Sequence, residues 1–251
     1  MLLACVLVIA CIGALYFVGN LARFQDAISV KESQTALQGI DDPGQLARVL
    51  KQYPSNRILK MVALANGDSI EIDAAMRRLL NEAEPRDLSK PAALSESSRA
   101  DLEALGRELT TAKSNAATAM PRYIALLKTA RDKLEHDARP LEVGNYTLAK
   151  FMAMIDEQHE DMTAIMPEAL AARVAYDSAY EQCVSLLIEH FGDYKVVNGQ
   201  LVFPSQSVAD SYNVAATIMT AVAKRMTRLE GERTALRQSQ PTRWRSFVEA
   251  P

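Results

Sequence analysis

The chain has 251 residues and a formal net charge of −3, from 28 basic and 31 acidic side chains. Charged residues make up 24% of the chain and apolar residues 49%, which is typical of a folded globular protein and not of a disordered one. The nearly even charge excludes a strongly basic protein that binds nucleic acid. Because only 6% of the residues are aromatic, the composition favours helices packed on helices over a β-sheet.

The N-terminal stretch is apolar, and Arg23 is its first charged residue. A helix of about 20 apolar residues crosses the hydrocarbon core of a bilayer. We therefore predict that residues 1–22 form an uncleaved transmembrane helix, so that the lipid bilayer is one partner of the protein. Tyr16 and Phe17 near its end suit the membrane–water interface.

Other interpretations of this stretch stay open. A cleaved signal peptide has a basic segment before its apolar core, and this chain has no Lys or Arg there. In a lipoprotein signal a cysteine follows a short apolar stretch, as Cys11 follows residues 8–10, so Cys11 is a candidate for lipidation. The basic residues nearest the span, Arg23 and Lys31, follow it and favour a body on the cytoplasmic side.

Residues 23–84 are predicted to form a juxtamembrane helical segment, followed by a linker at 85–95 that contains two prolines. Inside the segment, Asn66-Gly67 is a typical helix stop. Asp68, with Glu71 three residues later, has the spacing of a capping box. We therefore expect one helix to end at Asn66-Gly67 and another to begin at Asp68.

Residues 96–240 are predicted to form a bundle of three long helices. Apolar or small residues recur at alternating steps of three and four over 102–134, 148–191 and 208–236, which is the heptad pattern. The first stripe consists of Leu102, Leu105, Leu109, Ala112, Ala116, Ala119, Tyr123, Leu126, Ala130 and Leu134. The predicted fold is therefore all-α, with the transmembrane helix followed by an elongated antiparallel helical bundle.

One small β-hairpin is predicted at 194–203. Two short apolar runs flank Asn198-Gly199, and this dipeptide supplies the positive φ angles that a type I′ turn requires. Because the turn is exposed, Asn198 and Gly199 are candidate partner-binding residues.

His159 is the candidate metal ligand of the chain. Asp156, three residues earlier, places a carboxylate and an imidazole on one helix face, as in half of a di-iron carboxylate site. The second half is missing from the other helices, so packing in the core is the simpler interpretation of His159. Cys183 is expected to be a small buried apolar side chain. Since no phosphate loop, zinc-protease or serine-hydrolase motif occurs, we predict no catalytic residue, no cofactor and no enzymatic activity.

The C-terminal tail, 241–251, contains the single tryptophan of the chain. Tryptophan and arginine are enriched at the energetic centres of interfaces, so Arg243, Trp244 and Arg245 are candidate partner-binding residues. In the alternative interpretation, Trp244 and Phe247 fold back and cover one end of the bundle.

The stretch Val-Asn-Gly-Gln-Leu-Val-Phe-Pro-Ser at 197–205, followed by Tyr212-Asn213, resembles the C-terminal region of the YiaF-like family. Members of this family are bacterial envelope lipoproteins that are grouped as a domain of unknown function. The resemblance implies an N-terminal signal, long helices and a location on the periplasmic side of the membrane. It implies no catalytic residue, because none is assigned in the family.

These observations together predict a single-pass protein of the bacterial inner membrane with a periplasmic body. It acts as a non-enzymatic interaction or spacer subunit of a larger assembly, and its partners are other envelope or membrane proteins. Two alternatives remain, namely a helical bundle that binds a metal or small ligand near His159 and a cytoplasm-facing coiled-coil adaptor. The oligomeric state is left open.

Overall fold

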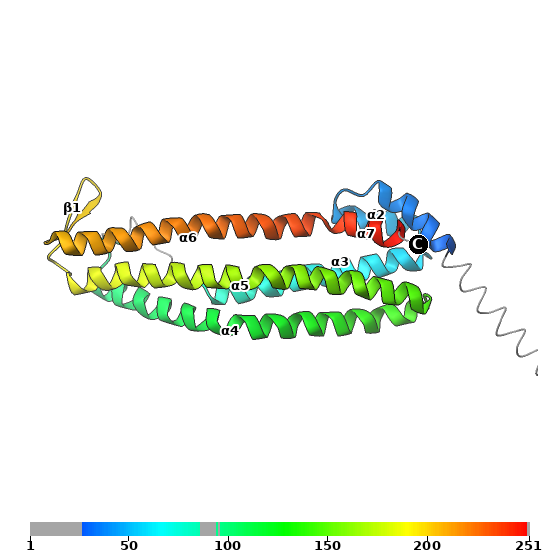
Figure 1. The fold of residues 1–251 in the computed structure, drawn as a ribbon, viewed down its shortest axis with the longest axis horizontal. Helices are drawn as coiled ribbons and strands as arrows, with labels where there is room; N and C mark the ends of the chain where they lie inside the picture. Colours follow the sequence, from blue (N-terminus) through cyan, green and yellow to red (C-terminus); the bar gives the residue numbers. More distant parts are fainter. Residues whose placement is uncertain (1–26, 86–93, 95, 250–251) are drawn as a thin grey trace, which may run out of the picture. The chain divides into compact units, whose positions relative to one another are not determined.

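The structure is a computed structural model that describes residues 27–85, 94 and 96–249. Residues 27–38 are helical. The following elements, labelled in Figure 1 where there is room, are η1 (Pro43–Gln45), α2 (Leu46–Gln52), α3 (Arg57–Glu82), α4 (Arg99–Ala138), η3 (Arg139–Leu141), α5 (Asn145–Glu189), β1 (Lys195–Val197), β2 (Gln200–Val202), α6 (Gln206–Gln238) and α7 (Gln240–Glu249). An all-α bundle with one small β-hairpin is thereby confirmed.

The predicted membrane segment, 1–22, lies outside the described residues, as do Cys11 and most of the predicted linker at 85–95. Across the described ranges, no helix is both long enough and apolar enough to cross a bilayer.

The chain divides into two compact units. Unit 1 takes its described residues from 1–72, 127–160 and 235–251, and unit 2 takes them from 73–126 and 161–234. Each unit therefore joins segments that are far apart in the sequence, and its core depends on long-range packing.

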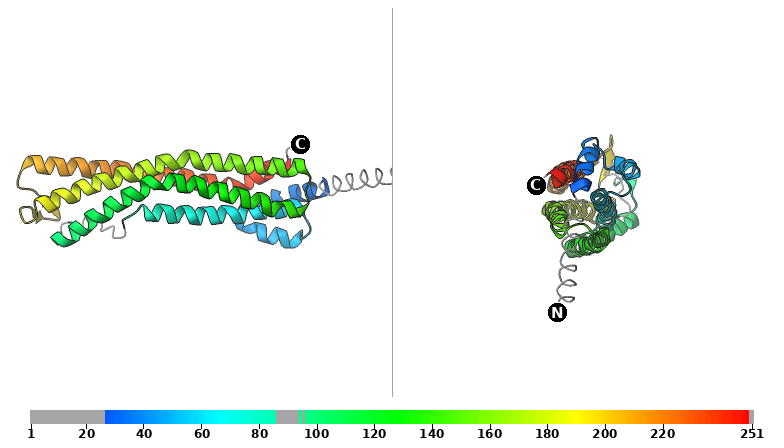
Figure 2. Two further views of the ribbon diagram at one scale, coloured as in Figure 1. Left: turned by 90° about the horizontal axis from the view of Figure 1, so that it is seen from below. Right: turned by 90° about the vertical axis from the view of Figure 1, so that its right-hand side faces the viewer.

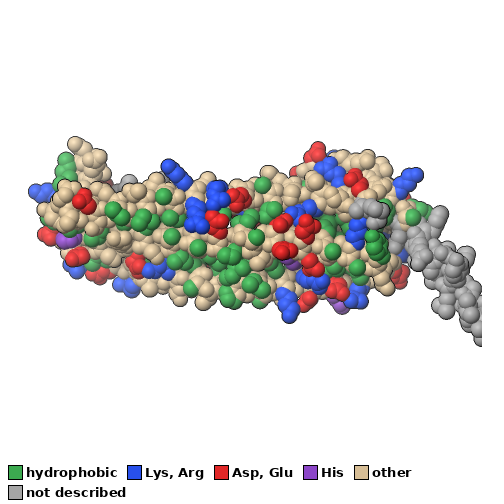
Figure 3. Space-filling model, viewed as in Figure 1, with side chains coloured by type: hydrophobic (Ala, Val, Ile, Leu, Met, Phe, Trp, Pro, Cys, Tyr) green, Lys and Arg blue, Asp and Glu red, His purple; other side chains and the backbone are tan. Residues whose placement is uncertain are grey.

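Successive long helices run antiparallel. In unit 1, η3 and the residues after it turn the chain from α4 back into α5 (Figures 1 and 2). In unit 2, α5 and α6 approach each other with opposite numbering. Glu168 pairs with Arg225 at 3.0 Å, whereas Cys183, later in α5, lies against Tyr212, earlier in α6. Basic and acidic side chains are interspersed on the face seen in Figure 3, in keeping with the small net charge.

The prediction of a helix boundary at Asn66-Gly67 is wrong, because α3 continues through it to Glu82. Asp68 lies inside the helix with an exposed fraction of 6% and does not cap a new one. The apolar stripe of α3 passes through this point, from the buried Ala65 to the buried Ile72. Burial of such a stripe outweighs the roughly 1 kcal/mol by which glycine disfavours a helix interior.

The heptad pattern predicted for α4 is confirmed. Its buried positions include Leu102, Leu105, Leu109, Ala112, Ala116, Ala119, Tyr123, Ala130 and Leu134. One position differs from the predicted pattern: Leu127 is buried, whereas Leu126, the predicted core residue, is only half-buried. In contrast, α6 has 33 residues but only three buried ones, Ala215, Met219 and Leu229.

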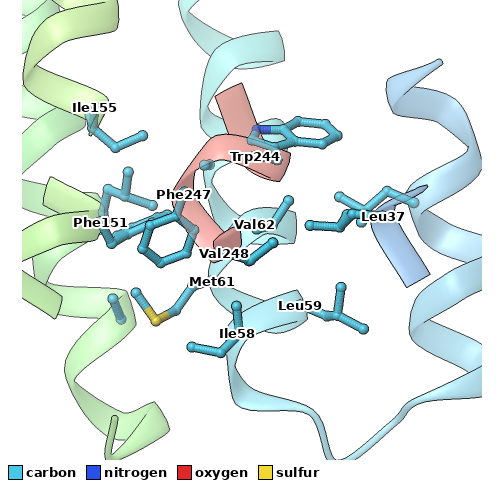
Figure 4. Packing of buried hydrophobic residues seen from close by; sticks show 14 of the residues in the cluster. Leu37, Ile58, Leu59, Met61, Val62, Phe151, Ile155, Trp244, Phe247 and Val248 are labelled. Atoms are coloured by element: carbon cyan, nitrogen blue, oxygen red, sulfur yellow. The ribbon is translucent and has the colours of Figure 1, made fainter. Parts of the chain in front are cut away.

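Buried side chains of α7 form part of the core of unit 1 (Figure 4). Trp244 has an exposed fraction of 1%, and Phe247 stacks at an angle on Phe151 with 5.6 Å between ring centroids. The Gln34 side chain donates a hydrogen bond to the Val248 carbonyl at 2.9 Å. The structure thus shows the alternative in which Trp244 and Phe247 pack back onto the bundle.

A buried amide connects the first described helix of unit 1 to the start of α3. Asn56 Oδ1 accepts hydrogen bonds from Ser33 Oγ at 3.0 Å and from the Leu59 backbone N–H at 2.9 Å. Its Nδ2 donates to the Ser29 carbonyl at 2.9 Å and to Glu32 Oε2 at 3.0 Å. Asn56 therefore acts as the N-cap of α3 and uses all four of its hydrogen-bonding positions.

We expect Trp244→Ala to lower the free energy of unfolding by about 3–5 kcal/mol, because it leaves a cavity in the core of unit 1. Denaturant unfolding followed by circular dichroism measures this change. Tyr146→Ala is the matched control, since Tyr146 is an exposed aromatic residue of the same unit, and it should change stability by about 0.5 kcal/mol or less. Equal effects of the two variants would contradict the burial of Trp244.

Candidate functional site

The predicted hairpin is present in unit 2. Its strands pair antiparallel, with Lys195 opposite Val202, Val196 opposite Leu201 and Val197 opposite Gln200. Asn198 has φ +53° and Gly199 has φ +76°. Both turn residues thus take the positive φ that the dipeptide predicts for a type I′ turn.

Aromatic rings connect the hairpin to α6 and to the turn that follows α5. The centroid of the Phe191 ring lies 6.3 Å from that of Tyr194, which lies 6.0 Å from that of Phe203. Phe203 in turn lies 5.1 Å from Tyr212 in α6. Edge-to-face and tilted ring pairs at these distances are favourable contacts, so the hairpin is held by a continuous aromatic series.

The series ends at a cavity inside unit 2. The cavity has a volume of about 420 Å³, which is within the usual range for small-ligand pockets. Its lining comprises Leu94, then Tyr176, Tyr180 and Cys183 of α5, and Tyr212, Ala216, Met219, Thr220, Ala223, Lys224 and Thr227 of α6. We refer to this cavity as the tyrosine trough.

The polar groups in the deeper part of the tyrosine trough are neutral at physiological pH. Burial raises the pKa of the Tyr212 hydroxyl to about 12 and the pKa of the Cys183 thiol to about 11. The thiol lies 4.0 Å from the Tyr212 carbonyl and 3.9 Å from Met219 Sδ. Since a buried, protonated thiol is a poor nucleophile, Cys183 acts as a small apolar side chain, as its sequence context predicts.

His159 lies in unit 1 and is half-buried, and burial lowers its pKa. Both carboxylate oxygens of Asp156 accept hydrogen bonds from Arg131, from Nε at 2.6 Å and from Nη2 at 3.2 Å. The acid that the sequence pattern pairs with His159 is therefore held by an arginine. Within the described ranges, no three His, Cys, Asp or Glu side chains gather in a way that could hold a metal ion.

The candidate residues of the tail belong to unit 1, whereas the hairpin belongs to unit 2. Trp244 is buried in the core, and its neighbours Arg243 and Arg245 are half-exposed. Arg245 donates a hydrogen bond to Thr242 Oγ1 at 3.3 Å. Among these three residues, only the two arginines have side chains that reach the surface.

Sequence reasoning missed a buried carboxylate in unit 2. Asp177 has an exposed fraction of 0%, and neither of its oxygens has a hydrogen-bond partner within the described part of the chain. Arg173 Nη1 lies 4.0 Å away and also pairs, through Nη2, with Glu84 at 2.6 Å. Burial raises the pKa of Asp177 to about 6, although Arg173 acts in the opposite direction. The signal was present, because Asp177 follows Val174 at heptad spacing.

Comparison of the chain with protein-family models, with curated proteins and with solved structures finds no match in any of the three. The resemblance to the YiaF-like family therefore stays a prediction based on the hairpin stretch. The residues that carry it lie together in unit 2, since Asn198-Gly199 forms the turn and Phe203 contacts Tyr212. Fold and site together define a helical bundle with an aromatic-anchored hairpin and an adjoining trough.

We expect Asp177 to make unit 2 more stable as the pH falls from 7 to 5. Its pKa is about 6 in the folded chain, against the ordinary aspartate value of 3.8 that applies once the chain unfolds, so between these values only the folded state holds the proton. Protonation thus favours folding, and the gain between pH 7 and pH 5 is on the order of 1 kcal/mol. Denaturant unfolding of the wild type and of Asp177→Asn at pH 5 and 7 measures this contribution.

The Asp177→Asn variant should show a smaller gain in stability between pH 7 and pH 5 than the wild type. The exposed Asp193 provides the matched control, since Asp193→Asn should leave the gain unchanged. A wild-type gain that Asp177→Asn does not reduce would show that another group is responsible.

Proposed function

We propose that the protein is a membrane-tethered, non-enzymatic helical protein of the bacterial envelope that binds another envelope protein through its hairpin. The charge-free stretch at 1–22 supports the tether. The resemblance of the hairpin stretch to the YiaF-like family supports a periplasmic body. The long helices support a spacer role.

The observation that carries the interaction role is the outward face of the hairpin. Residues opposite each other in an antiparallel pair share a face, and alternate residues along a strand lie on opposite faces. Val197 and Val202 therefore share the face that also carries Lys195 and Gln200. Their exposed fractions are 49% and 50%. On the other face, Val196 is 46% exposed, whereas Leu201 packs against the core of unit 2.

The helix that follows the hairpin also carries exposed apolar side chains. Val214 and Ile218 are separated by one turn of α6, and both are exposed. Figure 3 shows hydrophobic side chains along α6 and on the hairpin. Single exposed apolar residues are ordinary, but several of them on one hairpin and the helix that follows it support an interaction role for this part of unit 2.

The double variant Val197→Ser, Val202→Ser should reduce recovery of the bound partner about tenfold or more, since it removes the apolar centre of the proposed interface. Crosslinking in cells, purification of the tagged chain and quantitative mass spectrometry measure the recovery. Ile124→Ser is the matched control, because Ile124 is exposed and belongs to α4 in the same unit. If the double variant recovers as much of the bound partner as the Ile124→Ser control does, the hairpin is not the binding surface.

The location is tested separately by a reporter fused after Pro251 that is active only in the periplasm. We expect activity of this reporter and none of a matching cytoplasmic reporter. The opposite result would favour the cytoplasm-facing adaptor and remove the envelope assignment.

A further inference from the structure

The tyrosine trough is long and narrow. Its lining residues on α6 recur at steps of three and four, from Tyr212 through Ala216 to Thr227, and so form one face of the helix. At a rise of 1.5 Å per residue, Tyr212 and Thr227 lie about 22 Å apart along the helix. A volume of about 420 Å³ spread over this length suits a linear ligand better than a compact one.

One part of the trough is apolar and aromatic. Leu94, Tyr180 and Cys183 are almost completely buried, and Met219 lies beside them. Because the thiol and the hydroxyl of Tyr212 are neutral, this part favours an uncharged chain. Flat tyrosine rings and a flexible methionine provide good contact with hydrocarbon.

The other part of the trough carries a positive charge. Lys224 lines it, is exposed, and makes no ion pair with any residue in the described part of the chain. By contrast, Arg225 and Arg228 on the same helix both pair with Glu168. No acidic side chain occurs among the described residues that line the trough. The trough is therefore complementary to a ligand with a negative head group.

Lys224 can also donate hydrogen bonds to such a head group, whereas the threonine hydroxyl groups that line the trough cannot. Thr220 Oγ1 donates to the Ala216 carbonyl at 3.0 Å, and Thr227 Oγ1 donates to the Ala223 carbonyl at 3.1 Å. The two threonine hydroxyl protons are thus committed to the helix backbone. The three donors of the Lys224 ammonium group remain available for an anion.

We propose that the tyrosine trough binds a long-chain fatty acid, with its hydrocarbon chain along Tyr176, Tyr180 and Met219 and its carboxylate on Lys224. This binding is reversible and involves no covalent step. It can be tested separately from the hairpin interface, because the serine substitutions at Val197 and Val202 leave the trough lining intact.

The test uses the full chain in lipid nanodiscs and a palmitate analogue with a photoreactive diazirine in its chain. Crosslinks identified by mass spectrometry should map to 176–183 and 212–227. Unlabelled palmitate should compete for these sites, whereas cetyltrimethylammonium, which has a similar chain and the opposite charge, should compete weakly. Crosslinks spread evenly over the helices, or equal competition by the two amphiphiles, would overturn the proposal.

Variants separate the two parts of the trough. Lys224→Gln should weaken labelling about threefold to fivefold, as expected for loss of one exposed charge interaction, while Lys195→Gln, which removes a charge from the hairpin, should not. Ala216→Trp should fill the trough and abolish labelling, with circular dichroism as the check on folding. If the Ala216→Trp variant does not fold, the Lys224→Glu variant is used in its place. Unchanged labelling of Lys224→Glu by the photoreactive analogue would also overturn the proposal.

Discussion

Burial of one stripe of α4 is the constraint on which the rest of the structure depends. The stripe begins with leucines, continues with the small residues Ala112, Ala116 and Ala119, and is buried in both units. Small side chains let a neighbouring backbone approach closely, while leucines fill the spaces between helices. Each neighbouring helix must therefore supply a stripe of its own, and α3 does so without interruption at Gly67. Among the long helices of the described chain, α6 has the fewest buried residues, and it lines the trough together with α5.

The sequence predicted the features that depend on local pattern. The stripe of α4 and the turn at Asn198-Gly199 follow from periods and dihedral preferences that a short window contains. The boundary predicted at Asn66-Gly67 was wrong because that signal is also local, whereas the burial that overrides it comes from distant segments. The tyrosine trough could not be predicted for the same reason, since Leu94, α5 and α6 meet there only in the folded chain.

Two buried polar side chains, Asn56 in unit 1 and Asp177 in unit 2, differ in whether they have hydrogen-bond partners. In unit 1, Asn56 has a partner for every hydrogen-bonding position, so the network favours one arrangement of the first described helix and α3. In unit 2, Asp177 is buried with no hydrogen bond, and its nearest described cation is 4.0 Å away. A buried charge without hydrogen bonds raises the free energy of the folded state, and protonation of the carboxylate reduces this penalty. The stability of unit 2 is therefore sensitive to acidity at this position.

Tyr212 contributes both to the support of the hairpin and to the wall of the trough. One part of its ring contacts Phe203 and so supports the hairpin, and the same residue forms part of the trough wall. A group that displaces this ring in the trough also moves the support of the hairpin, and a protein that holds the hairpin restricts the ring. Thermodynamic linkage requires such effects to be equal in both directions. Through this one shared side chain, the two proposed binding events would be energetically coupled.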